Sequence, residues 1–342
     1  MTKRKFSKPP RLKRYAGTKA VNSLIKQAAI SSLSIKLPVR CNLSCTYCYG
    51  NNQIGDLKFS EMTKVLKEAI DIGVQSISIL GEGEPLLYKN LFQLIDYINN
   101  YGIPAIVYTN NTLITEKKAE ALFKRNVLVV GKLNSLRNDI QRKISGDKDA
   151  YKIFEGLNIL KKIGFNRTVP SRLALHTVII SDNYDELCEI WQMCRDENII
   201  PYFQVFVPPA RYGKNKKHIK KLTVAKEKVK ELFFKLYRID KDKYGLIWDK
   251  NYTYPIPGMG CNVIKSGCAI DSFGNVKLCA YLDESLGNIR NESLKDILSS
   301  EKVKKIRGFI YYKNKKNFYG CRTMAFNLTG NRFAKDPFFW QA

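Results

Sequence analysis

Three cysteines lie within eight residues of one another, in the segment Cys41-Asn42-Leu43-Ser44-Cys45-Thr46-Tyr47-Cys48. Thiolates are soft ligands that favour zinc or iron–sulfur centres. A structural zinc site needs four ligands and no open position, and neither His176 nor His218, the two histidines of the chain, is near in sequence. Three thiolates on a four-iron cluster would instead leave one iron free to bind another molecule.

A second group of cysteines is spread over the last quarter of the chain, at Cys261, Cys268, Cys279 and Cys321. Between the second and third of them, Phe273-Gly274-Asn275 stands among alternating residues and predicts a β-hairpin turn that brings the two ends together. Four thiolates fit a fully ligated [4Fe–4S] cluster or a zinc ion. Cys188 and Cys194 are left over, and we expect no disulfide framework in a cytoplasmic protein.

Strand-like and helix-like segments alternate regularly between residues 32 and 209. Strands are predicted at 33–37, 75–80, 105–108, 127–130, 172–180 and 202–207, with helical apolar periodicity between them. This β-then-α alternation predicts a parallel sheet with right-handed crossovers, either doubly wound or curled toward a barrel. Both architectures place function at the carboxyl ends of the strands.

Polar and glycine-rich segments follow the predicted strands in turn. The cysteine segment follows the first strand, Gly81-Glu82-Gly83-Glu84-Pro85 the second, Thr109-Asn110-Asn111 the third and Lys132-Leu133-Asn134-Ser135 the fourth. Because the carboxyl ends of parallel strands meet at one edge, these segments predict an active site on that rim.

The first cysteine segment resembles the signature of the radical S-adenosylmethionine (SAM) enzymes, matched here by Cys41, Cys45, Tyr47 and Cys48. The resemblance implies a partial (β/α)6 barrel and a [4Fe–4S] cluster whose open iron is chelated by SAM. It also implies reductive cleavage of SAM to a 5′-deoxyadenosyl radical that abstracts a substrate hydrogen. A flavodoxin- or ferredoxin-type protein is the implied electron donor.

The family holds SAM through residues at the strand ends, and the matching positions here are Tyr47, Gly83, Glu84, Asn110, Ser135, Arg172 and Val205. Ser135 resembles a residue that binds the SAM ribose or carboxylate, and Arg172 a basic residue that meets that carboxylate. Glu82 departs from the pattern, because glycine is common there. For His176 we favour a core position.

The C-terminal cysteines resemble those of the SPASM domain, as do Leu286-Gly287-Asn288-Ile289 and Gly320-Cys321-Arg322. The resemblance implies that the set at Cys261, Cys268, Cys279 and Cys321 binds an auxiliary [4Fe–4S] cluster for electron transfer. Residues 313–319 and 336–340 contain none of the cysteines that a second auxiliary cluster needs. We therefore expect a twitch-like module with one auxiliary cluster.

The chain is accordingly divided into a basic N-terminal extension (1–30), a radical SAM barrel (31–212), a basic linker and helix (213–255) and a SPASM/twitch-like module (256–342). The net charge is +27, with lysine clusters at 3–26, 214–221 and 313–316. Such clusters suit an acidic partner or a solvated lysine-rich surface. No apolar run is long enough to span a membrane and no secretory signal is present, so we expect no membrane partner and a cytoplasmic protein.

A ribosomally made peptide is the substrate we favour, undergoing oxidation, cross-linking or epimerisation, because basic clusters suit an acidic leader. Epimerisation needs a hydrogen-atom donor, for which Cys188 and Cys194 are the spare thiols. One alternative is oxidation or epimerisation of an aminosugar or nucleotide-linked molecule. Another is a basic zinc protein that binds nucleic acid, which would leave the strand-end motifs unexplained.

Overall fold

The computed structural model describes residues 30–50, 53–209, 215–248, 262–282, 284–312, 320–334 and 336. The predicted N-terminal extension, the lysines at 313–316 and Cys261 lie outside these ranges. In the described part of the chain, no helix combines the length and the apolarity that crossing a bilayer requires.

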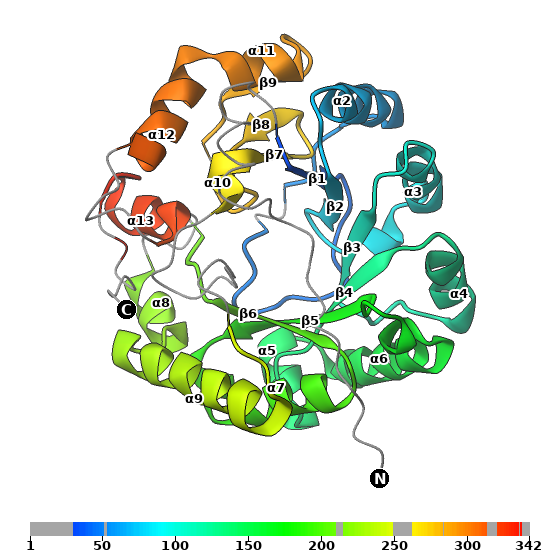
Figure 1. The fold of residues 1–342 in the computed structure, drawn as a ribbon, viewed down its shortest axis with the longest axis vertical. Helices are drawn as coiled ribbons and strands as arrows, with labels where there is room; N and C mark the ends of the chain where they lie inside the picture. The colour runs from blue at the N-terminus through cyan, green and yellow to red at the C-terminus, as the bar shows by residue number, and fades with distance from the viewer. Residues whose placement is uncertain are drawn as a thin grey trace.

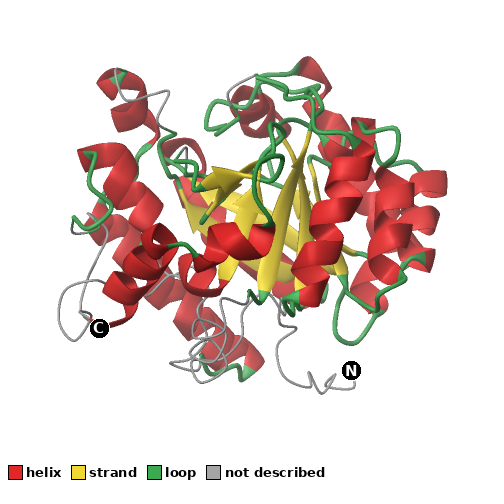
Figure 2. Cartoon of the chain, turned by 90° about the horizontal axis from the view of Figure 1, so that it is seen from above, coloured by secondary structure: helices red, strands yellow, loops and turns green. Residues whose placement is uncertain are grey.

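Six parallel strands form the centre of the molecule: β1 (Ser32–Leu37), β2 (Ser76–Gly81), β3 (Ala105–Thr109), β4 (Leu128–Lys132), β5 (Leu173–Ile179) and β6 (Ile200–Val205). Each strand pairs with the next one along the chain. The sheet curves so that the strands surround an interior, as Figures 1 and 2 show. The prediction of a partial (β/α)6 barrel is confirmed.

Helices lie between successive strands and cover the outside of the sheet: α2 (Phe59–Asp71), α3 (Leu91–Asn99), α4 (Glu116–Lys124), α5 (Asn138–Ser145), α6 (Tyr151–Ile163) and α7 (Leu187–Asp196). Single 3₁₀ turns occur at Pro85–Leu87, Lys148–Ala150 and Phe165–Arg167, and a longer one at Ser181–Glu186. After β6 come α8 (Lys216–Leu222) and α9 (Lys226–Tyr244). Helix α5 was not predicted, because Ile140 and Ile144 are its only apolar residues.

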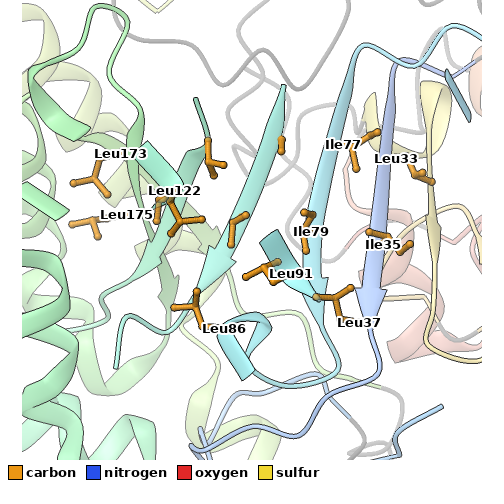
Figure 3. Packing of buried hydrophobic residues seen from close by; sticks show 14 of the residues in the cluster. Leu33, Ile35, Leu37, Ile77, Ile79, Leu86, Leu91, Leu122, Leu173 and Leu175 are labelled. Carbon is orange, nitrogen blue, oxygen red and sulfur yellow. The ribbon is translucent and has the colours of Figure 1, made fainter. Parts of the chain in front are cut away.

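The two faces of the strands have different environments because side chains alternate along a strand. Leu33, Ile35 and Leu37 point outward and are fully buried under the helices, where Leu91 of α3 joins them (Figure 3). Each such side chain stabilises the fold by about 1.5–3 kcal/mol. The inward positions form a smaller apolar layer and end in polar side chains at the rim, of which Lys132 is one.

The C-terminal segment adds three strands to the same sheet: β7 (Gly267–Ile270), β8 (Asn275–Lys277) and β9 (Gly287–Asn288). Strand β7 pairs with β1 in parallel, and β8 and β9 follow antiparallel, which gives a nine-stranded sheet. The predicted hairpin is therefore confirmed, whereas its continuation of the barrel sheet was not predicted. The helices of this segment are α10 (Asn262–Ser266), α11 (Leu294–Ser299), α12 (Glu301–Tyr312) and α13 (Arg322–Thr329).

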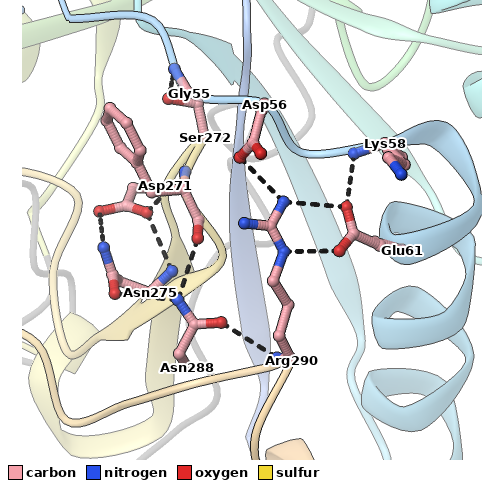
Figure 4. Close-up of polar contacts among 10 residues, drawn as sticks. Gly55, Asp56, Lys58, Glu61, Asp271, Ser272, Asn275, Asn288 and Arg290 are labelled. Carbon is pink, nitrogen blue, oxygen red and sulfur yellow. Dashed lines mark hydrogen bonds and ion pairs between the residues drawn. The ribbon is translucent and has the colours of Figure 1, made fainter.

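The hairpin turn is bound to the chain segment that follows the first cysteine loop (Figure 4). The Ser272 hydroxyl accepts a hydrogen bond from the Gly55 amide at 2.9 Å. Arg290 donates to Asp56 at 2.9 Å and to Glu61 at 2.6 Å. The hydrogen bonds that Glu61 accepts from Arg290 and from the Lys58 amide lower its pKa to about 2. The two regions that carry the cysteines are thus held side by side.

Candidate active site at the carboxyl ends of the strands

A cavity of about 150 Å³ lies at the carboxyl ends of the barrel strands. Cys41, Cys45 and Cys48 all line it. So do five of the residues expected to contact SAM, namely Tyr47, Gly83, Glu84, Asn110 and Val205. The structure therefore gathers the predicted strand-end segments around one space.

The cysteine loop is held by helices that approach it from the barrel. The amides of Ser44 and Thr46 donate to the carbonyls of Ser145 and Ile144, at the end of α5, at 3.1 and 3.0 Å. His218 of α8 contacts the Thr46 carbonyl through its Nε2 atom at 2.9 Å. Helix α5, which was not predicted from the sequence, therefore helps to fix the cysteine loop.

The sulfur atoms of this loop have polar contacts suited to a negative charge. The Leu43 amide donates to Cys41 Sγ at 3.5 Å, and the Gly50 amide to Cys48 Sγ at 3.3 Å. Asn110 Nδ2 lies 3.8 Å from Cys41 Sγ. Such donors orient thiolate ligands and stabilise their charge.

Burial raises the pKa of the Cys41 and Cys45 thiols. Burial raises the pKa of Cys45 to about 12, the charge on Cys48 adds to this rise, and Lys132 opposes it. Burial also lowers the pKa of Lys132 to about 8. A bound metal centre supplies the positive charge that deprotonates such thiols.

The donor set fits a cluster better than a single ion. Within the described ranges, no three Cys, His, Asp or Glu side chains are close enough together to hold one metal ion. A [4Fe–4S] cluster takes its thiolates on separate irons and so accepts more widely spaced ligands. Three thiols around one cavity therefore suit a cluster with one open iron.

Glu84 ties the second strand-end segment to the third. Its carboxylate accepts hydrogen bonds from Thr109 Oγ1 at 2.8 Å, from the Asn110 amide at 2.7 Å and from the Leu86 amide at 3.0 Å. Burial raises the pKa of Glu84, although these donors oppose the rise. Its observed role is to join two loops of the rim.

Gly83 is required by the close approach of the cysteine loop. A Cβ atom at this position would lie 2.1 Å from the Arg40 carbonyl carbon and 2.2 Å from the Cys41 nitrogen. Both atoms belong to the backbone and cannot move aside independently. Gly83 therefore sets how closely the second strand-end segment packs against the cluster loop.

Two of the predicted SAM contacts are wrong. Arg172 precedes β5, so it lies at the amino ends of the strands, opposite the cavity. Its guanidinium carbon is 4.0 Å from the centre of the Phe123 ring, and Nη1 donates to the Phe123 carbonyl and to Asn126. Ser135 is fully buried and does not line the cavity, because its hydroxyl bonds Glu186 at 2.8 Å.

The two spare cysteines, considered above as hydrogen-atom donors, lie away from the cavity. Both lie on α7, on the outer face of the sheet, and neither lines the cavity. Cys194 is fully buried beside Trp191, and burial raises the pKa of its thiol well above the ordinary value. Cys188 is half-buried.

Several residues that line the site were not among the predicted SAM contacts. Lys132 lies under the cysteines, with its Nζ atom 5.0 Å from the centre of the Tyr47 ring. His176 lines the cavity rather than the core, and its Nε2 atom is 3.0 Å from Gln204 Oε1. The usable signal was period-two alternation, because Lys132, His176 and Gln204 all occupy inward positions of their strands and line the cavity.

A second cavity, of about 230 Å³, adjoins the first on the side of the hairpin. Tyr49, Glu82, Ala280 and Tyr281 line both cavities. The rings of Tyr49 and Tyr281 are 4.5 Å apart, between centres. The charged residues that line the second cavity are Lys36, Glu82, Asp271 and Lys277.

The C-terminal cysteines have more apolar surroundings than the first three. Cys268 lies on β7, and burial raises its pKa to about 12. Cys279 follows β8 and packs beside the apolar cluster of Ile264 and Leu278. Cys321 precedes α13, and its sulfur accepts a hydrogen bond from the Met324 amide at 3.4 Å. Because Cys261 is outside the described residues, the four-cysteine set stays a prediction.

Comparison with known proteins identifies two domains. A family model of the radical SAM superfamily matches residues 35–194, and a model of the SPASM iron–sulfur cluster-binding domain matches residues 261–323. An AdoMet-dependent heme synthase of Methanosarcina barkeri is 25% identical over 339 residues, covering 89% of this chain and 94% of that protein. A probable GTP 3′,8-cyclase of Sulfurisphaera tokodaii is 27% identical over 296 residues, covering 82% and 90%.

A solved structure shares the fold over almost the whole chain. SuiB of Streptococcus suis, bound to its precursor peptide SuiA, matches with a TM-score of 0.70 at 19% identity. The match covers 95% of this chain and 78% of that one. At this level of identity the likeness concerns the fold alone.

Proposed function

This chain is a radical SAM enzyme with a SPASM iron–sulfur domain, and we propose that it modifies a peptide at the junction of the two cavities. When bound, the cluster and SAM supply one-electron cleavage of SAM and the capacity to abstract a hydrogen atom from carbon. The protein binds and orients these groups and excludes water.

The residues around the first cavity divide this work. Cys41, Cys45 and Cys48 hold the cluster. The backbone at Gly83, fixed by the hydrogen bonds of Glu84, receives the SAM amino group. Lys132 is the only lysine or arginine among the described residues that line this cavity. We therefore assign to Lys132, in place of Arg172, the role of the cation that would face the SAM carboxylate. The segment from Val205, which also lines this cavity, would pack against adenine.

The observation that carries the peptide proposal is the charge balance of the second cavity. Its described lining contains two lysines and two carboxylates, in the pairs Lys36–Glu82 and Lys277–Asp271. A buried charge is costly unless it is paired. A polyphosphate or a polycarboxylate would bring unpaired charge into this space, whereas a neutral peptide segment would not.

Exposed lysines near the cysteine loop support a peptide with an acidic leader. Four of them lie on α8, at Lys216, Lys217, Lys220 and Lys221. The same helix contacts the cysteine loop through His218 and the Thr46 carbonyl. An acidic segment bound along α8 would place the following residues near the cavities by electrostatic steering.

The auxiliary module is proposed to transfer an electron, since a cluster with four cysteine ligands has no iron open to substrate. Oxidation or cross-linking of the peptide is the outcome that this role supports. Epimerisation is less well supported, because Cys188 and Cys194 lie on the outside of the barrel.

The proposal is tested on protein purified without oxygen. We expect about eight irons per chain, four for each of two clusters, and formation of 5′-deoxyadenosine from SAM under reducing conditions. Mass spectrometry of candidate acidic precursor peptides incubated with the enzyme should then show a change in the mass of one of them. SAM cleavage together with conversion of a nucleotide-linked sugar, and of no peptide, would contradict the proposed substrate.

A further inference from the structure

The second cavity contains two lysine–carboxylate pairs that are similarly buried but unequally satisfied. Asp271 accepts from Lys277 at 3.0 Å, from the amides of Phe273 and Asn275 at 3.0 and 2.9 Å, and from Asn275 Nδ2 at 3.2 Å. Four donors complete the coordination of this carboxylate. Asp271 therefore shapes the hairpin turn and has little capacity left for a ligand.

The Lys36–Glu82 pair has fewer and longer hydrogen bonds than the Lys277–Asp271 pair. Lys36 Nζ lies 3.4 Å from Glu82 Oε2, and the Ser272 hydroxyl lies 3.4 Å from Glu82 Oε1. The Lys36 and Glu82 side chains are only 8% and 5% exposed. An ammonium group carries three donors, and a carboxylate has about four acceptor positions. In the described part of the chain, most of these donor and acceptor positions form no hydrogen bond with a protein atom.

Building on the proposed function, we propose that Lys36 and Glu82 bind a backbone amide of the peptide substrate. The amide carbonyl accepts from Lys36 Nζ, and the amide N–H donates to the Glu82 carboxylate. A neutral group with one donor and one acceptor forms a hydrogen bond with each charged side chain and leaves the net charge of the cavity unchanged. A carboxylate or an ammonium group would satisfy one member of the pair and repel the other.

The position of the pair places the bound amide beside the cofactor. Glu82 and Tyr49 line both cavities, and Lys36 Nζ is 4.8 Å from the centre of the Tyr49 ring. Glu82 also lies between Gly81 and Gly83, in the segment expected to hold the SAM amino group. A substrate residue bound here would thus border the space in which hydrogen abstraction takes place.

The test uses two probes that differ by one charge. N-acetyl-alanyl-alanine methylamide is neutral, and N-acetyl-alanyl-alanine carries one carboxylate. Calorimetric titration into the iron-loaded, SAM-bound enzyme should show about tenfold tighter binding of the neutral probe, a difference of about 1.4 kcal/mol. Glu82→Gln removes one negative charge and should reverse this preference. Lys36→Gln should weaken both probes, and the anionic probe more.

Lys67→Gln serves as the matched control, because Lys67 belongs to an exposed ion pair with Asp71 on α2. It should leave both affinities unchanged. The inference fails if the wild-type enzyme binds both probes equally. It also fails if Glu82→Gln keeps its iron and does not reverse the preference. Where Glu82→Gln loses iron, the inference fails if Lys36→Gln keeps its iron and binds both probes as tightly as the wild-type enzyme. The preference together with SAM cleavage but no peptide conversion would overturn the proposed function and leave this binding site standing.

Discussion

The two sets of cysteines in this chain differ in how the fold assembles them. Cys41, Cys45 and Cys48 come from one loop, line an open cavity and influence one another's ionisation. The described members of the other set, Cys268 and Cys279 on either side of a hairpin and Cys321 before a helix, come from separate elements and pack against apolar residues.

This difference indicates different functions for the two centres. A local loop beside a cavity can present three ligands and leave a fourth position open for SAM. A set assembled from several elements closes around its cluster, so folding of the module and binding of the cluster depend on each other. The first centre should therefore work when the second is damaged, whereas the second should not survive the loss of a ligand.

The largest effect is expected when the first set is removed. The triple substitution Cys41→Ala, Cys45→Ala, Cys48→Ala should lower the iron content by about half, because one of two four-iron clusters is lost. It should abolish formation of 5′-deoxyadenosine from SAM. Iron analysis and chromatography of the products check both expectations. Undiminished 5′-deoxyadenosine would refute the assignment of this loop.

The next largest effect concerns the packing of the first loop rather than its ligands. Gly83→Ala would place a Cβ atom against the backbone of Arg40 and Cys41. We expect SAM cleavage to fall by about tenfold or more, since backbone cannot yield as a flexible side chain does. Gly102→Ala is the control: its φ of 69° is strained, but a Cβ atom there meets nothing within 4 Å. Equal losses in both variants would show that the contact with the cysteine loop is not the cause.

The sequence predicts the parts of this molecule that follow local rules. Apolar alternation located all six barrel strands, and the spacing of three cysteines located the cluster loop. The position of Arg172 was wrong although its strand was predicted well: Arg172 directly precedes β5, and the start of a strand lies at the end of the barrel opposite the cavity. Ser135 was wrong because its partner, Glu186, is distant in sequence. Tertiary contacts of this kind, including the pairing of β7 with β1, have no local signal.

Loss of one cysteine from the second set should have a smaller and more selective effect on activity. Cys321→Ala should make the auxiliary cluster labile, because three thiolates leave one iron exposed. SAM cleavage should persist while substrate conversion falls, since the barrel keeps its own core and ligands. Iron counting and low-temperature electron paramagnetic resonance measure the two clusters separately.

Cys188→Ala is the matched control for this variant, because Cys188 is a half-buried cysteine that lines neither cavity. It should keep the full iron content and both signals. If Cys321→Ala behaves in the same way, the fourth ligand of the auxiliary cluster lies elsewhere.

The smallest effect is expected at the contact that joins the two regions. Arg290→Ala removes the ion pairs to Asp56 and Glu61, which are partly exposed and stabilise by about 1 kcal/mol at most. Hydrogen exchange should show about fivefold weaker protection of the Gly55 and Leu57 amides, which bond Ser272. This loss should not depend on pH between 8 and 6. The folded-state pKa of Glu61 is lowered to about 2, so its contribution is complete above the ordinary pKa of about 4.3 and disappears only as the pH falls toward 2. A loss that changes between pH 8 and 6 would mean that another titrating group joins the cluster loop to the hairpin.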